Sequence, residues 1–377
     1  MNILFPLSAF YPSQIGGPCN TLYWHTRALN QNGINPIIVT STVGIDNNIV
    51  NSDKWLDLDC GRTYYGQGRT LRLKTILTAL VKIKKVDILH LNSLFSPISS
   101  LSFIYAILFS QKIKIIWSVR GELNKNALQF SNWKKKPFLF FYKNFNKNVT
   151  YHSTSDEETK HIKEMFPHSK VVQLPNYIDP APRLNLIKSN YLLFLGRIHQ
   201  IKAIHKLIEA LSYSEKFKNS DFQLYIVGKQ EERHNNYKAQ LVEQIRSLGL
   251  SHKIVFKGHV EGEEKEMLYA KAYALILPSE TENFGNVVVE ALNHGTPVIA
   301  SRGTPWSILE TYKAGYHCSN DPELLSKAID KLLSLSQIDY NEMSANSIKL
   351  VEDKFDVNSN ILKWITVYKQ VLNENSK

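Results

Sequence analysis

The sequence predicts an α/β protein with two domains, each built on a parallel sheet that carries helices on both faces. The chain has 377 residues, which is more than a single hydrophobic core usually supports. Short apolar segments alternate with helical ones, which is typical of parallel sheets. The alternation runs through the chain twice, and a polar, proline-containing stretch at 175–190 separates the two runs. We therefore expect one domain over residues 1–183 and a second over 184–356.

The first run supplies six expected strands. Each is short, apolar or β-branched and bounded by turns, and they cover 2–5, 36–40, 87–91, 114–118, 149–153 and 171–174. Helical stretches lie between some of them, at 19–31 and 70–84. The apolar opening MNILFPLSAF lacks a basic leader and is interrupted by Pro6, so we interpret it as a buried strand and not as a signal peptide.

The second run repeats the pattern from residue 191 onward. Strands are expected at 191–196, 223–228, 253–258, 274–277 and 297–300, and helices at 203–211, 236–248 and 322–334. The last helix, about 357–372, is amphipathic.

The most informative stretch is PSETENFGNVVVEALNHGTPVIAS, residues 278–301. Two carboxylates, Glu282 and Glu290, flank the turn Phe284-Gly285-Asn286, and we expect strand, loop, short helix and strand in that order. Ligands of open parallel sheets bind where strands end and helices begin, and the free N–H groups of a helix start suit phosphate oxygens. Carboxylates beside them can accept hydrogen bonds from sugar or ribose hydroxyls. The stretch therefore predicts a nucleotide-sugar site, although a structural turn with a surface carboxylate is the plain alternative.

Two cations follow the first strand of the second domain. Arg197 offers a planar fork and Lys202 a point charge, and both suit phosphate oxygens at the carboxyl edge of the sheet. Fixed cations stabilise the negative charge that grows on a departing diphosphate. An ordinary solvated basic loop is the alternative.

In the first domain, Gly16-Gly17 follows the first strand and Arg120 follows the fourth. The glycine pair precedes Pro18, a suitable first helical residue, so its amides are candidates for a phosphate or acceptor contact, whereas a glycine pair taken alone is more often a turn. Arg120 is placed to reach the same edge of the sheet. We expect His90, His152 and His199 to be ordinary core or surface residues.

Taken together, these segments resemble the group 1 glycosyltransferases over roughly the whole chain. The resemblance is carried by the glutamate stretch and by YPSQIGGPCNTLYWHTRALNQNGINPIIVT, VDILHLN, WSVRGEL, YHSTSDEE, LPNYID, FLGRIHQIKAIHKLIEA, LYIVGK and IVFKGHV, which occur in the family's order. It implies the GT-B fold, two Rossmann-like domains facing a central cleft, with the last helix returning to the first domain. It also implies retaining transfer of a hexose-type sugar from a nucleoside diphosphate, with UDP favoured and GDP open, to a hydroxyl acceptor.

The resemblance assigns roles residue by residue. It implies that Arg197 and Lys202 clamp the diphosphate, that Glu282 binds the donor sugar and that Glu290 binds the ribose. Further substrate contacts are implied for Gly16, Gly17, Arg120, Val260, Phe284, Gly285, Asn286 and Val287. Many relatives carry histidine near position 120, so the contact made there is open.

No cofactor and no metal are expected, because the cations can compensate the diphosphate charge. The pair Asp57 and Asp59 matches a metal motif of the other glycosyltransferase fold, but such a match arises easily by chance. Two rival functions remain: an epimerase of nucleotide sugars with the same architecture, and a non-catalytic sugar-nucleotide-binding protein.

The net charge of +11 lies almost entirely in the first half of the chain. Residues 1–180 hold 21 Lys+Arg and 11 Asp+Glu, with dense basic and aromatic patches at 69–85 and 132–147. Such patches suit an anionic membrane surface, while core aromatics with solvated lysines are the alternative. No nucleic-acid motif is present. Three scattered cysteines favour a cytoplasmic protein. Peripheral association with the inner face of the cytoplasmic membrane is an open alternative. The expected acceptor is a lipid-linked or surface-polysaccharide glycan.

Overall fold

The computed structural model describes residues 1–13, 17–46, 48–68, 85–109, 113–124, 128, 132–145, 149–179, 181–230 and 235–374. The chain divides into two compact units, unit 1 with residues 1–177 and 357–377 and unit 2 with residues 178–356. The division falls between Tyr177 and Ile178, a few residues before the boundary expected after 183. Tyr177 is buried in a core of unit 1, whereas the N–H of Ile178 donates to the carbonyl of Phe355 in unit 2.

Unit 1 is built on a sheet of eight strands in the order β3-β4-β2-β1-β5-β6-β7-β8. Six of them were expected from the sequence: β1 (Asn2–Pro6), β2 (Asn35–Ser41), β5 (Ile88–Asn92), β6 (Lys114–Ser118), β7 (Val149–Ser153) and β8 (Lys170–Gln173). The hairpin of β3 (Trp55–Leu58) and β4 (Gly61–Gly66) was not expected as a pair. It is the one antiparallel pairing among the described strands of this sheet. The stretch 70–84, expected to be a helix, lies outside the described residues.

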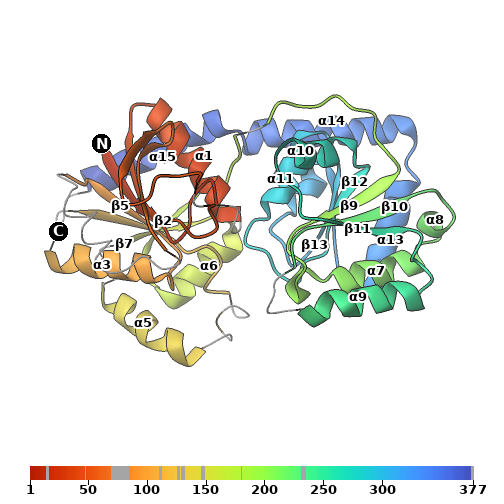
Figure 1. The fold of residues 1–377 in the computed structure, drawn as a ribbon, viewed down its shortest axis with the longest axis horizontal. Helices are drawn as coiled ribbons and strands as arrows, with labels where there is room; N and C mark the ends of the chain where they lie inside the picture. Colours follow the sequence, from red (N-terminus) through yellow and green to blue (C-terminus); the bar gives the residue numbers. More distant parts are fainter. Residues whose placement is uncertain are drawn as a thin grey trace. The chain divides into compact units, whose positions relative to one another are not determined.

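The described helices of unit 1 cover both faces of this sheet (Figure 1). On one face α1 (Gly17–Gln31) packs beside α15 (Val357–Asn373), and their side chains share a core with Phe5 and Ile38. The other face carries α3 (Pro97–Phe109), α5 (Asn132–Phe145) and α6 (Asp156–Met165) over Leu89 and Trp117. The last helix of the chain is thus part of unit 1.

Helix α5 carries the described part of the basic and aromatic patch, and its aromatic residues divide between core and surface. Leu139 and Tyr142 are buried against the sheet, whereas Phe138 and Phe140 are 46% and 73% exposed. Lys136 and Lys143 are exposed on the same helix. The helix therefore buries one apolar face, as the core alternative expects, and leaves two further phenylalanines outside.

Unit 2 has a sheet of six strands in the order β11-β10-β9-β12-β13-β14, and every pairing in it is parallel. The strands are β9 (Tyr191–Leu195), β10 (Gln223–Val227), β11 (Ile254–Gly258), β12 (Ala274–Leu277), β13 (Val298–Ser301) and β14 (Gly315–Cys318). The strand order reverses at β9, because β10 and β11 follow on one side and β12 returns to the other. The crevice at such a reversal is where open α/β sheets bind ligands.

The helices of unit 2 form two layers (Figure 1). One layer holds α7 (Ile204–Tyr213), α8 (Glu215–Lys218), α9 (Asn235–Ser247) and α13 (Pro322–Leu333), whose apolar residues share a core with Leu192 and Ile276. The other holds α10 (Gly262–Lys271), α11 (Asn286–Asn293), α12 (Ile308–Tyr312) and α14 (Gln337–Lys354). Over the described part of the chain, every helix is too short or too polar to cross a bilayer.

Candidate functional site

The candidate site of unit 2 lies at the carboxyl ends of β9 and β12. These two strands are direct neighbours, with Leu192 opposite Ala274 and Leu193 opposite Leu275. The loops that leave them are tied together, because the N–H of Glu280 donates to the carbonyl of Ile201 at 2.8 Å. The basic segment and the glutamate stretch therefore meet at the strand reversal.

The glutamate stretch turns into α11 at Gly285. This residue has φ 82°, a left-handed backbone conformation that residues other than glycine rarely adopt. A Cβ added there would lie 3.2 Å from both the Cγ of Glu282 and a methyl of Leu277. Conformation and space together require glycine here. The three valines at 287–289 lie inside this helix, because the turn at Gly285 starts α11 directly at Asn286.

An aromatic cluster packs against the turn at Phe284-Gly285. The indole N–H of Trp306 donates to the carbonyl of Phe284, and the ring of Phe284 packs on Trp306 and Phe355 with centroid distances of 5.1 and 5.7 Å. Phe284 was expected to contact substrate. Its side chain is only 6% exposed and instead anchors the turn. Trp306 could not be predicted as a partner of Phe284, because it lies 22 positions away along the chain.

Lys202 and Glu282 form a largely buried ion pair across the two loops. The Nζ of Lys202 donates to the Oε2 of Glu282, and their side chains are 13% and 17% exposed. Lys202 ends the short 3-10 helix η2 (Gln200–Lys202), which His199 caps by accepting from the N–H of Ile201 at 3.1 Å. Ion pairs shielded from water in this way are stronger than exposed ones. A cation and a carboxylate are thus fixed directly beside the turn that starts α11.

The other residues predicted around the diphosphate follow β9 or begin α11. Arg197 is exposed, two positions beyond the end of β9. Asn286 and Val287 form the start of α11 and are partly exposed. The N–H groups of a first helical turn have no partner within the helix, so they suit the oxygen atoms of an anion.

Glu290 lies one turn further along α11 and is held from α10. The hydroxyl of Tyr269 donates to its Oε2 at 2.8 Å, and the Nζ of Lys265 lies 3.2 Å from the same atom. Burial would lower the pKa of Lys265, but the carboxylates of Glu290 and Glu266 raise it overall. Glu290 is 9% exposed, so the surface-charge alternative is excluded. Sequence reasoning missed Lys265 and Tyr269, which lie on another helix.

Val260 is buried just beyond the end of β11. β11 is separated from β9 by β10, and among the described residues no hydrogen bond or ion pair joins Val260 to the Lys202–Glu282 pair.

In unit 1 the predicted residues lie at the carboxyl edge of the sheet. Gly17 begins α1, and Gly16 lies outside the described residues. Arg120 has φ 59° and follows β6. Its Nε and Nη2 donate to the Oδ1 of Asn92 at 3.1 and 2.8 Å, and its Nη1 donates to the Oδ1 of Asn176 at 2.9 Å.

Three buried histidines form a continuous hydrogen-bonded chain beside Arg120. From one end it joins Tyr177, His25, Tyr368, His90, Ser118, His152 and the carbonyl of Leu174, over distances of 2.5 to 2.9 Å. A carbonyl can only accept, so His152 donates through Nε2 and accepts from Ser118 through Nδ1. The same logic carried along the chain gives His90 and His25 the same tautomer. The chain is complete only when all three rings are neutral.

This neutrality predicts acid sensitivity of unit 1. Burial, followed by nearby charge such as that of Arg120, lowers the pKa of His25 and of His152 to about 3, and that of His90 well below 6.5. Below pH 6.5 the unfolded chain binds protons that the folded unit does not, so the free energy of unfolding falls by about 1.4 kcal/mol per pH unit for each histidine. We expect the melting temperature, followed by tryptophan fluorescence, to drop steeply between pH 7.5 and 5. His152→Gln should reduce the slope by about a third, and a flat wild-type profile would contradict the neutral chain.

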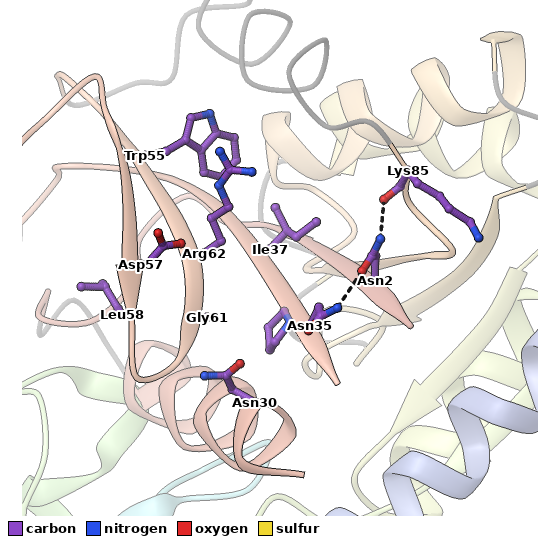
Figure 2. Close-up of a pocket in the computed structure, with 11 residues that line it drawn as sticks. Asn2, Asn30, Asn35, Ile37, Trp55, Asp57, Leu58, Gly61, Arg62 and Lys85 are labelled. Atoms are coloured by element: carbon purple, nitrogen blue, oxygen red, sulfur yellow. Dashed lines mark hydrogen bonds between the residues drawn. The ribbon is translucent and has the colours of Figure 1, made fainter. Parts of the chain in front are cut away.

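The larger described hollow of unit 1, about 720 Å³, lies elsewhere. Figure 2 shows it at the amino ends of β1 and β2, where the amide of Asn35 donates to Asn2 and the guanidinium of Arg62 stacks on Trp55. Ligands of parallel sheets bind at the opposite, carboxyl edge, so we do not assign the site to this hollow.

Residues 177–350 match the model of a protein family described as glycosyl transferases group 1. The chain is similar to an uncharacterized glycosyltransferase of Methanocaldococcus jannaschii, with 32% identity over 181 residues, 47% of this chain and 44% of that one. It is also similar to the O-antigen chain mannosyltransferase RfbU of Salmonella typhimurium, with 35% identity over 114 residues, 30% of each chain. The chain therefore matches less than half of the length of these relatives.

The structure is similar to that of the Anabaena protein HepE, which was solved in complex with UDP and glucose. The TM-score is 0.76 at 16% identity, and the match covers 98% of this chain and 100% of that one. Similarity at this level of identity establishes the fold. It confirms the predicted GT-B fold with its two parallel-sheet α/β units.

Proposed function

We propose that this chain, whose residues 177–350 match the model of the group 1 glycosyltransferases, transfers a hexose-type sugar from a nucleoside diphosphate, preferably UDP, with retention of configuration. The acceptor is a hydroxyl of a lipid-linked or surface-polysaccharide glycan. The observation that carries the proposal is the buried Lys202–Glu282 pair beside the glycine turn of α11. The loops after β9 and β12 thereby bring together a cation, a carboxylate that can accept hydrogen bonds from sugar hydroxyls, and the start of a helix. A sugar diphosphate requires all three.

Each group has a role in the transfer. Lys202, Arg197 and the first N–H groups of α11 bind the diphosphate and stabilise its growing charge as the sugar–phosphate bond breaks. Glu282 accepts hydrogen bonds from the donor sugar, and Glu290, fixed by Lys265 and Tyr269, accepts them from the ribose. The leaving phosphate takes the proton of the acceptor hydroxyl on the same face of the sugar. With these cations in place, the reaction proceeds without a metal.

The names of similar proteins support the choice of substrates. HepE was solved with UDP and glucose, and RfbU is named for mannosyl transfer to the O-antigen chain. A UDP-sugar donor and a surface-glycan acceptor agree with both.

The test is to incubate the protein with a panel of sugar nucleotides, with and without glycan acceptors, in EDTA. We expect acceptor-dependent release of UDP and a product that keeps the donor's anomeric configuration by NMR. Epimer formation without acceptor would establish the epimerase instead. If the nucleotide raised the melting temperature but no UDP were released under any condition, the protein would be a sugar-nucleotide-binding protein without transferase activity.

We also propose that α5 contacts the cytoplasmic face of an anionic membrane, where a lipid-linked acceptor resides. Phe138 and Phe140 are exposed beside Lys136 and Lys143, which suits the boundary between headgroups and acyl chains. Burying one phenylalanine contributes about 1.5–3 kcal/mol, so Phe140→Ser should weaken binding to anionic vesicles at least about tenfold.

Co-sedimentation with vesicles at low salt measures this binding. Leu362→Ser is the matched control, since Leu362 is 59% exposed on α15, a helix of the opposite face. Equal binding of Phe140→Ser and wild type to anionic vesicles would refute the role of α5. Vesicles of neutral lipid should bind neither wild type nor Phe140→Ser.

A further inference from the structure

Arg120 carries a positive charge that is in direct contact with no described carboxylate. All three of its hydrogen bonds go to the neutral amide oxygens of Asn92 and Asn176. No ion pair within 4.0 Å joins it to Asp or Glu among the residues that the structure describes. A charge removed from water without a partner is costly, so its retention calls for an explanation.

The nearest acidic neighbour is already occupied. The carboxylate of Glu158 accepts from the N–H of Gly121 at 2.5 Å, and from the N–H and hydroxyl of Thr154 at 2.7 and 2.9 Å. These bonds fix the turn after β6 and the start of α6. Glu158 therefore shapes the loop that presents Arg120. Burial lowers the pKa of Arg120 and the charge of Glu158 opposes this shift, but the carboxylate makes no direct contact with the guanidinium.

The histidine chain does not compensate the charge either. With all three rings neutral, the chain from Tyr177 to Leu174 adds no negative group. The side chains of the chain are uncharged and hydrogen-bonded to one another, and they line one side of Arg120.

Arg120 also opens to a hollow. A space of about 20 Å³ is lined by Arg120, His25, Asn176, Tyr177 and Trp364, and Arg120 itself is partly exposed. This volume admits a single water-sized group. It accommodates one oxygen atom of a ligand but not a sugar ring.

We propose that Arg120 and Asn176 bind an oxyanion, a phosphoryl group carried by the acceptor substrate, with one of its oxygens in this hollow. The inference rests on the proposed function and adds to it that the acceptor is charged. The guanidinium fork matches the spacing of two phosphate oxygens, and the amide of Asn176 makes no described hydrogen bond through its Nδ2, which leaves a further donor. Arg120 thus becomes a determinant of acceptor choice.

The experiment titrates inorganic phosphate into the full chain at constant ionic strength and reads binding by calorimetry. Since the diphosphate site of unit 2 also binds anions, Lys202→Gln is used to remove it. We expect Lys202→Gln to keep one phosphate site and Lys202→Gln/Arg120→Gln to lose at least tenfold in its affinity. Arg62→Gln removes another arginine of unit 1 and should change nothing.

Three further outcomes decide the assignment. If phosphate binding in the Lys202→Gln protein is the same with and without Arg120, the inference is wrong. If saturating UDP abolishes the Arg120-dependent binding in wild type, the anion belongs to the donor and the acceptor assignment is wrong. Arg120→Lys, which keeps the charge but loses the fork, should fold and bind with intermediate affinity; binding as tight as wild type would refute recognition by the guanidinium.

The proposed function is tested separately in the same proteins. Stabilisation by a UDP-sugar should survive Arg120→Gln and fail in Lys202→Gln. If no UDP-sugar stabilised the wild-type protein, the proposed function would be overturned, while the phosphate site of unit 1 would remain supported by the titrations.

Discussion

Lys202→Gln should lower kcat about 100- to 1,000-fold, the largest loss we expect from a single side chain of this protein. The lysine is fixed by Glu282 beside the start of α11, so it meets the diphosphate without reorganisation. Removing one such preorganised donor typically costs about 2.7–4 kcal/mol of transition-state stabilisation. Steady-state release of UDP with the preferred donor and acceptor measures the loss.

Two further variants separate catalysis from folding. Lys202→Gln leaves the carboxylate of Glu282 partly buried and unpaired, so it should also destabilise unit 2, whereas Lys202→Gln/Glu282→Gln should recover stability but not activity. Lys206→Gln breaks the neighbouring pair with Glu280, at 2.7 Å but more exposed, and should keep kcat within about twofold. If Lys206→Gln were as inactive as Lys202→Gln, general loop damage would explain both.

The strands and the glutamate stretch could be predicted because their signals are local. Apolar segments such as 191–196 and 274–277 are bounded by turns, and Gly285 marks the start of a helix within a few residues. The valines at 287–289 favour a strand when taken alone, since β-branched residues fit strands better than helices. Here tertiary packing of Val288 and Val289 in the core prevails.

The partners of the site residues could not be predicted, because they depend on strand order. Lys202 and Glu282 are 80 positions apart and meet only because β12 returns to the side of β9. Tyr368 lies 343 positions from His25, yet α15 brings it into the histidine chain. A histidine interpreted alone gives no indication of such a network. The same holds for Arg120, whose lack of a carboxylate partner is a property of the folded unit.

Gly285→Ala should lower activity about tenfold or more, while costing only about 1–2 kcal/mol of stability. The stability cost arises because alanine at φ 82° is strained. The activity cost arises because the new methyl would lie 3.2 Å from the Cγ of Glu282 and 3.5 Å from the indole nitrogen of Trp306. To relieve this contact, the side chain of Glu282 must move by a few tenths of an ångström, which disturbs its ion pair with Lys202. A shift of about 1 Å in an aligned group can cost about 100-fold in rate, so a loss of about tenfold is expected for this smaller one.

Gly249→Ala is the matched control for the strain alone. Gly249 has φ 70°, and a Cβ added to it would meet nothing within 4 Å. Thermal denaturation should show similar losses of stability for the two variants, because both pay the same backbone strain. Only Gly285→Ala should lose UDP-sugar stabilisation and turnover, since only there does the methyl press on the ion pair. Equal activity in the two variants would mean that the position of Glu282 is not what the glycine protects, and the assignment of the site to this turn would fail.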